Sequence, residues 1–293
     1  MTEGDYQNSN PTPQLTPSIK SNWWRLIVYL VFFLISTGIF ILPIFLFFPE
    51  VFGNYDLIEN NAAYLLSSQA ATFAGVIATT YMISKEIEYK SLVSYRLSLN
   101  LRSLGAGFLL GVLIMAIIGI AFHVFGLVHF SYKGFSSTII TSFLIYLLVA
   151  LIEEIIFRGY VLTNMQEKNT EFWAATLSSI LFGLSHFGND HFTWIGCATI
   201  AISGYLMAIM ALKSGSISSA VGFHWSWNFV QGPILGFAVS GHAEKGVFQA
   251  NSTVTDVLTG GKFGAEGSIF VALFTLTLAV YFSFKAFCRS EKN

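Results

Sequence analysis

The stretch TIITSFLIYLLVALIEEIIFRGYVLT, residues 138–163, is apolar along most of its length but carries Glu153, Glu154 and Arg158. A membrane-spanning helix needs about 20 mostly apolar residues, so this stretch is long enough to cross a bilayer. Ionised side chains are expensive in hydrocarbon, and those that occur there usually face partners and serve a function. The sequence therefore predicts a membrane helix that carries a polar site.

The composition of the whole chain supports a lipid-embedded protein. Of its 293 residues, 54% are hydrophobic and 11% charged, and the mean hydropathy is +0.64. Soluble domains have about 25% charged residues. The net charge of −1 and the scattered basic residues exclude a nucleic-acid-binding surface. Cys197 and Cys288 lack metal-ligand spacing, so we interpret them as small apolar residues without a disulfide.

Eight segments come near the length of a membrane helix and predict an all-α, polytopic bundle of about eight transmembrane helices. These segments are 26–48, 63–83, 104–128, 138–163, 172–187, 192–212, 216–240 and 267–284. The corresponding regions are a flexible tail (1–22), three spans (23–137), a core of four spans (138–240), an outward loop (241–266), and a last span with a short tail (267–293).

Small residues and prolines add local predictions within these spans. Pro43 and Pro233 predict kinks, because proline removes a backbone donor. Gly107 with Gly111 has the four-residue spacing of small residues that favours close packing of membrane helices.

Basic residues are concentrated in alternate connections, which sets a predicted orientation. They precede the first span, fill the connection between the second and third, and recur after the fourth, the sixth and the last: Lys20, Arg25, Lys85, Lys90, Arg96, Arg102, Lys168, Lys213 and Lys285. Short cytoplasmic loops carry an excess of lysine and arginine. We therefore expect an integral, multi-pass protein with both termini in the cytoplasm, and the compact chain favours a bacterial plasma membrane.

Polar residues on three predicted helices fall at similar depths. Glu154 and Arg158 are four residues apart and share a helix face, whereas Glu153 is rotated by about 100° and is less neutralised. His224 and Asn228 also share a face. At about 1.5 Å per residue, Glu153, His224, Asn228 and His186 lie roughly 12 to 21 Å from the cytoplasmic end. Each alone also fits an ion pair or an interhelical contact, but together they favour a site.

These residues form three motifs in order along the chain: Glu153-Glu154-x-x-x-Arg158, Phe182-x-x-x-His186 and His224-x-x-x-Asn228. The set resembles the motifs of the CAAX-processing and bacteriocin-processing (CPBP, or Abi) intramembrane endopeptidases, which include the type II CAAX prenyl endopeptidases. The resemblance covers roughly residues 138–235, and every motif position is filled.

The resemblance implies hydrolysis of a peptide bond within the membrane by an activated water. Glu153 would be the general base, and His186 would help to hold and polarise the water. His224 and Asn228 would donate hydrogen bonds to the tetrahedral oxyanion. The Glu154–Arg158 pair would fix the helix and tune its charge.

Zinc is an alternative to a cofactor-free mechanism. Glu153, His186 and His224 could supply two imidazoles and a carboxylate, leaving a fourth position for water. The sequence lacks His-Glu-x-x-His, the spacing typical of helical zinc peptidases. Members of the family have been described as metalloproteases, but better-understood relatives imply a metal-free glutamate mechanism, which we favour.

The expected partners are a membrane-anchored peptide or protein substrate and the membrane lipids, with no nucleic acid. Two other functions stay open. One is a non-catalytic membrane adaptor or bacteriocin immunity protein. The other, which we favour less, is a proton-coupled transporter with Glu153, Glu154 and His186 as a relay, although the sequence shows no inverted repeat.

Overall fold

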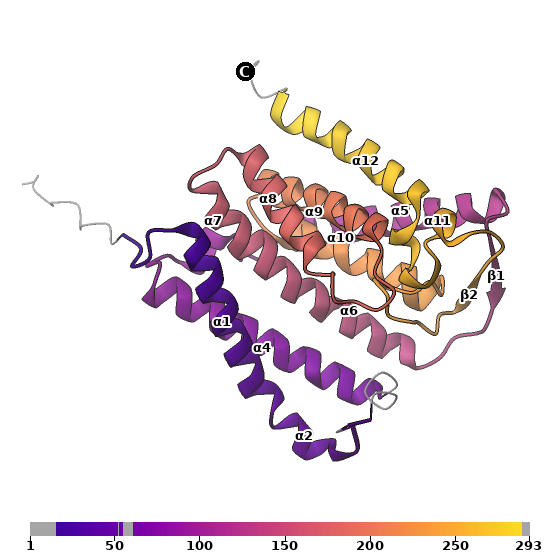
Figure 1. The fold of residues 1–293 in the computed structure, drawn as a ribbon, viewed down its shortest axis with the longest axis horizontal. Helices are drawn as coiled ribbons and strands as arrows, with labels where there is room; N and C mark the ends of the chain where they lie inside the picture. Colours follow the sequence, from indigo (N-terminus) through magenta and orange to yellow (C-terminus); the bar gives the residue numbers. More distant parts are fainter. Residues whose placement is uncertain (1–15, 52, 55–60, 289–293) are drawn as a thin grey trace, which may run out of the picture.

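The computed structural model describes residues 16–51, 53–54 and 61–288 of the chain, and it is predominantly helical (Figure 1). The longer helices are α1 (Asn22–Ile41), α4 (Ala62–Glu86), α5 (Leu101–Val124), α6 (Thr138–Glu154), α8 (Glu171–Leu184), α9 (Trp194–Ser214), α10 (Ser218–Phe229) and α12 (Ile269–Ser283). Short helices are α2 (Ile44–Phe47), α7 (Leu162–Gln166) and α11 (Asp256–Thr259). Three π-helical turns, η3 (Ile155–Val161), η4 (Val230–Ile234) and η7 (Phe284–Cys288), extend α6, α10 and α12.

The all-α, polytopic fold predicted from the sequence is confirmed, but the count of eight spans is not. Six helical stretches of the described chain are long and apolar enough to cross a membrane: Asn22–Phe47, Ala62–Glu86, Leu101–Val124, Thr138–Gln166, Trp194–Ser214 and Ile269–Phe287. The fifth predicted span, 172–187, corresponds to α8, which has only 14 residues. The seventh, 216–240, contains the 12 residues of α10 and the five of η4.

The short helix α10 is surrounded by protein. All its residues are buried except Trp225 and Phe229, which are partly buried. Helix α5 approaches it closely, because a Cβ on Gly107 or Gly111 would overlap atoms of α10. The packing predicted for this glycine pair is therefore present. Because α10 contacts other helices rather than lipid, it does not need the length of a lipid-facing span.

A two-stranded antiparallel sheet, which the sequence analysis did not predict, closes one end of the bundle. Strand β1 (Val128–Tyr132) pairs with β2 (Phe248–Ser252) in the register Val128↔Ser252 to Tyr132↔Phe248. The third predicted span, 104–128, therefore ends early, at Val124. The outward loop 241–266 contains β2, α11 and the 3₁₀ turn η5 (Gly261–Phe263), and most of the turn η6 (Ala265–Gly267).

Proline produces the predicted interruptions. Helix α1 ends at Ile41, and α2 starts only after Pro43. Pro233 lies inside the π-helical turn η4. In both places the missing proline N–H coincides with the departure from a regular α-helix.

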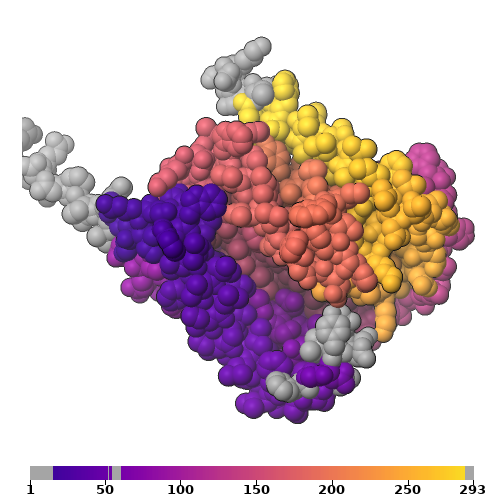
Figure 2. Space-filling view, viewed as in Figure 1, coloured from indigo at the N-terminus to yellow at the C-terminus, as the bar shows by residue number. Residues whose placement is uncertain are grey.

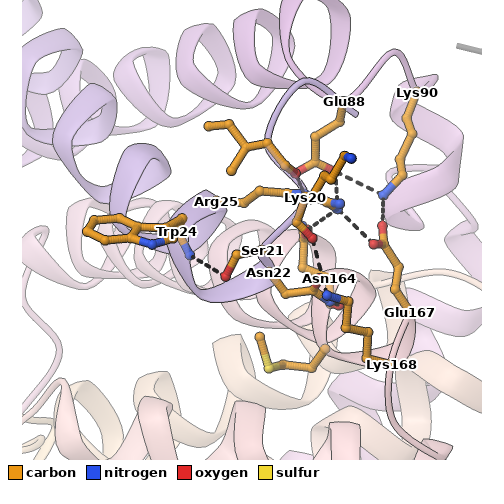
Figure 3. Close-up of polar contacts among 12 residues, drawn as sticks. Lys20, Ser21, Asn22, Trp24, Arg25, Glu88, Lys90, Asn164, Glu167 and Lys168 are labelled. Atoms are coloured by element: carbon orange, nitrogen blue, oxygen red, sulfur yellow. Dashed lines mark hydrogen bonds and ion pairs between the residues drawn. The ribbon is translucent and has the colours of Figure 1, made fainter. Parts of the chain in front are cut away.

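Helices α1 and α4 form one flank of the molecule and α12 forms another, with α8, α9 and α10 between them (Figures 1 and 2). A polar network anchors the first flank (Figure 3). Arg25 of α1 pairs with Glu167 at 2.7 Å. Glu88, after α4, is fully buried and accepts hydrogen bonds from Lys90, at 2.9 Å, and from the Tyr160 hydroxyl, at 2.7 Å. Burial favours a higher pKa for Glu167, but hydrogen bonds from Lys90 and Arg25 lower that pKa below its usual value.

Basic residues of several connections gather at this same end of the bundle. Arg25 and Lys90 both contact Glu167, and Lys213 lies 3.4 Å from Glu171. The predicted grouping of these residues on one side therefore agrees with the fold. The cytoplasmic location of that side stays a prediction. Residues 1–15 of the predicted tail and residues 289–293 lie outside the described residues.

Candidate active site

The centre of the site is a fully buried carboxylate with two nitrogen partners. Glu154 is the last residue of α6, and its Oε1 accepts a hydrogen bond from Nη1 of Arg158 at 2.9 Å. The same oxygen lies 3.0 Å from Nδ1 of His224 on α10. Glu154 and Arg158 have no exposed side-chain surface. The pair predicted from the four-residue spacing therefore forms, and it also contacts His224.

The helix that carries this pair is not α-helical throughout. The π-helical turn η3 begins directly after Glu154 and contains Arg158. The second turn, η4, begins two residues after Asn228. The sequence predicted a kink at Pro233, which lies inside η4, but it did not predict the π-helical turn η3. Single π-turns within α-helices are rare overall, and many of those that occur lie at functional sites.

Arg158 also packs against the face of an aromatic ring. Its guanidinium carbon lies 4.1 Å from the centroid of the Phe182 ring, within the range of a cation–π interaction. Gly204 of α9 makes room for the guanidinium, because a Cβ there would stand 2.7 Å from Nη2. Within the described residues, Nε and Nη2 have no hydrogen-bond partner. Arg158 is therefore positioned by one carboxylate and by packing.

Glu153 is the less neutralised of the two acids, as the helix geometry predicts. Its Oε2 lies 3.6 Å from Nε2 of His224, which is too long for a hydrogen bond. Its side chain keeps 27% of its surface exposed, and Arg158 bonds Glu154 instead. The His224 ring therefore lies between two carboxylates, one on each nitrogen.

His186 and Asn228 reach a small cavity beside His224. The cavity has a volume of about 30 Å³ and is lined by Phe182, His186, Ile200, Ser203, Met207, Phe223, His224, Trp227, Asn228, Ser240 and Glu266. This volume suffices for one or two water molecules. Glu153 is not among the lining residues and approaches His224 directly.

His186 lies two residues beyond the end of α8, whereas the sequence analysis placed it inside the fifth span. Its Nδ1 is 3.0 Å from the Phe182 carbonyl oxygen. Because Nδ1 meets an acceptor, that nitrogen carries the proton and Nε2 remains for other partners. The Phe182 ring packs edge-on against both His186 and His224, with centroids at 5.1 and 5.8 Å.

Sequence reasoning missed two polar residues of the cavity, Ser240 and Glu266. Ser240 ends the seventh predicted span, and Glu266 belongs to the predicted outward loop. An acid in a loop is normally exposed, and only the glycine-rich run around residues 260–267 signals an unusual backbone there. Their contribution to the site depends on tertiary folding.

The zinc alternative requires Glu153, His186 and His224 to converge on one point. Among the described residues, no group of three or more His, Cys, Asp and Glu side chains is placed to hold a metal ion. Glu153 and His224 are neighbours, but Glu153 does not line the cavity that His186 and His224 share. The arrangement as it stands does not fit that ligand set.

Residues 135–230 match the sequence model of a family described as type II CAAX prenyl endopeptidase Rce1-like. This segment is Rce1-like. No curated protein matches the chain.

The Rce1-like segment contains all seven named residues of the three motifs, from Glu153 to Asn228, and it ends before Ser240 and Glu266. The resemblance inferred from the motifs is confirmed for this third of the chain. Together with six apolar helices, the match supports an integral, multi-pass membrane protein and a protease of the CAAX type.

Proposed function

We propose that this protein is an intramembrane endopeptidase that hydrolyses a peptide bond of a membrane-associated peptide or protein. The observation that carries the proposal is the position of His224. One ring nitrogen faces Glu154, the other faces Glu153, and the ring lines a cavity that it shares with His186 and Asn228. The Rce1-like segment supports a protease in general, and from the geometry we infer the role of each residue in catalysis.

Glu153 acts as the general base. It accepts a proton from a water, whose oxygen bonds to the carbonyl carbon of the substrate. The C–N bond then breaks, and the proton passes from Glu153 to the departing nitrogen, which leaves as an amine. Glu153 suits this role because its side chain is partly exposed and its carboxylate is not bonded to Arg158. A positioned general base contributes typically about 10²–10⁴-fold to a rate.

The imidazoles and the carboxamide hold the reacting groups. His186 positions the water through Nε2, because its Nδ1 is directed at a backbone carbonyl. His224 and Asn228 donate hydrogen bonds to the oxyanion. Since Nδ1 of His224 faces Glu154, donation to the substrate comes from Nε2 and requires a proton on both ring nitrogens.

Glu154 and Arg158 are positioning residues. Glu154 orients the His224 ring through Nδ1, and Arg158 neutralises the buried carboxylate. A buried carboxylate without its cation would be strongly destabilising. The pair thus keeps the imidazole in place without contacting the substrate.

The cavity also limits how the substrate binds. Its volume of about 30 Å³ accommodates water but no peptide. Substrate binding therefore has to widen the space between Phe182, Phe223 and Trp227, whose side chains line it. Membrane lipids and a membrane-anchored substrate are the partners we propose.

The experiment compares Glu153→Gln with the native protein. Membrane peptides from cells carrying each form are quantified by mass spectrometry, with Glu171→Gln as the control, because Glu171 is exposed and pairs with Lys213. We expect uncut substrate to accumulate only with Glu153→Gln. Identical peptide patterns would exclude Glu153 as the base, and a full cellular phenotype with this variant would favour the adaptor function.

Metal dependence is tested separately on the purified native protein. The mechanism proposed above predicts that a zinc chelator leaves cleavage unchanged. A loss of cleavage that added Zn²⁺ restores would replace the metal-free mechanism by a zinc-dependent one.

A further inference from the structure

The segment that follows η4 folds back over the end of α10 and brings a carboxyl group into the cavity. Glu266 lies in the 3₁₀ turn η6, only 4% exposed, and lines the cavity together with His186, His224 and Asn228. The preceding Gly264 has φ +110°, and a Cβ there would overlap the Ala238 carbonyl oxygen. This backbone conformation favours glycine and lets the turn approach the cavity.

Two neighbours fix the Glu266 carboxyl. The Gln231 side-chain amide of η4 donates to Oε2, and it also donates to the Ala238 carbonyl oxygen at 2.8 Å. The Ser240 hydroxyl donates a hydrogen bond to Oε1 at 3.4 Å. Each carboxyl oxygen thus accepts one side-chain hydrogen bond and keeps a second lone pair on which a proton can reside.

Glu266 has no cationic partner at ion-pair distance among the described residues. The titratable groups around it are Tyr146 and Glu244 on one side and His186 and His224 across the cavity. Burial raises the pKa of Glu266 to about 7. A large fraction of the carboxyl groups is therefore neutral near pH 7, and a neutral carboxyl group can donate a hydrogen bond.

We propose that Glu266 is a substrate-facing group of this site, whose carboxyl donates a hydrogen bond to a carbonyl oxygen of the bound peptide. The inference rests on the proposed endopeptidase function. A peptide backbone supplies carbonyl acceptors, and in the small cavity at most one or two waters separate Glu266 from the imidazoles. An ionised Glu266 would lose this donor and would repel the oxyanion that forms during hydrolysis.

Glu244 provides a matched control. It comes from the same loop, accepts a hydrogen bond from the Tyr146 hydroxyl, and burial also raises its pKa. Its side chain lies against Gly232 and does not line the cavity. Glu244→Gln therefore removes a comparable acid without removing a group from the site.

The first experiment measures kcat/KM against pH for the native protein, Glu266→Gln, Glu266→Leu and Glu244→Gln, with the cleaved peptide identified as described above. We expect Glu266→Leu to lower kcat/KM roughly three- to tenfold near pH 6, the loss typical of one hydrogen bond. Glu266→Gln keeps a donor and should lose less. Its kcat/KM should also fall less above pH 7 than that of the native protein and of Glu244→Gln. Melting temperatures show whether each variant is folded.

The second experiment detects the proton without turnover. Infrared difference spectra of the native protein between pH 6 and pH 8.5 should contain a protonated-carboxyl band that is missing from Glu266→Gln and present in Glu244→Gln. Equal spectra for the native protein and Glu266→Gln would overturn the inference, as would a folded Glu266→Leu with native kcat/KM and pH profile. Absence of cleavage by the native protein would instead overturn the proposed function and, with it, this inference.

Discussion

The strongest test of the buried site is the removal of Arg158, which among the described residues is the only Lys or Arg that pairs with Glu154. Arg158→Met replaces the guanidinium by an apolar side chain of similar length. Glu154, without exposed surface, then keeps only Nδ1 of His224 as a partner on its Oε1. The variant therefore leaves a buried carboxylate without its neutralising charge.

The magnitude follows from this burial. Removing one partner of a buried ion pair costs about 3–5 kcal/mol, because the remaining charge is uncompensated. For a chain of this size, 1 kcal/mol corresponds to about 2–4 °C in the melting temperature. We therefore expect Arg158→Met to melt about 6–20 °C below the native protein. The double variant Glu154→Gln/Arg158→Met carries no charge at either position and should recover more than half of that loss.

The melting temperatures of the native protein, Arg158→Met, the double variant and the single variant Glu154→Gln are measured by thermal unfolding in one detergent at one pH. A melting temperature of Arg158→Met within 2 °C of native would contradict the assignment of a fully buried ion pair. A double variant whose loss equals the sum of the two single losses would show that the two side chains act independently. Either result would refute the coupling that the 2.9 Å contact implies.

Three further predictions concern packing, pH and the polar network. Gly204→Ala would place a Cβ 2.7 Å from Nη2 of Arg158, so we expect a lower melting temperature and reduced peptide cleavage. The control Gly105→Ala, whose Cβ would have no atom within 4 Å, should resemble the native protein in both assays. Glu266 has a folded pKa of about 7 against a usual value of 4.5, so between these values the folded state binds more protons than the unfolded state. Stability should therefore fall as pH rises through this window, by about 3 kcal/mol in total from Glu266. Melting curves at pH 5 and pH 8 should show a larger fall in the native protein than in Glu266→Gln, which keeps Glu244 with its raised pKa. Glu88→Ala removes the acceptor of two buried tyrosine hydroxyls and should cost about 2–5 kcal/mol, and a melting temperature within 2 °C of native would contradict this.

The membrane-helix content was predictable because it depends on local composition. A run such as residues 138–163 has the length and hydropathy that a bilayer requires, and the helix forms there. The same reasoning predicted a span at 216–240, which is not confirmed. Its residues are apolar because they contact α5 and α9 rather than lipid, and composition does not distinguish these two environments.

The site was predictable where its contacts are local. Glu154 and Arg158 are neighbours along one helix, so their spacing was sufficient to predict the pair. The contact between Glu154 and His224 joins residues 70 positions apart and depends on the rotation of two helices. Depth along a span gave no information on this rotation. Glu266 was missed for a related reason, because its burial depends on a turn that folds back over the bundle.

The π-helical turn η3 has a consequence for how the two ends of the fourth span are related. An α-helix turns by about 100° per residue, so one additional residue in a turn offsets everything beyond it by a similar angle. Glu154 lies on one side of η3, and Asn164 and Glu167, which bind Arg25, lie on the other. Deleting one residue between 155 and 161 would leave a continuous α-helix. Such a helix could keep either the contacts of Glu154 in the site or the contacts of Asn164 and Glu167 with Arg25 of α1, but not both at once.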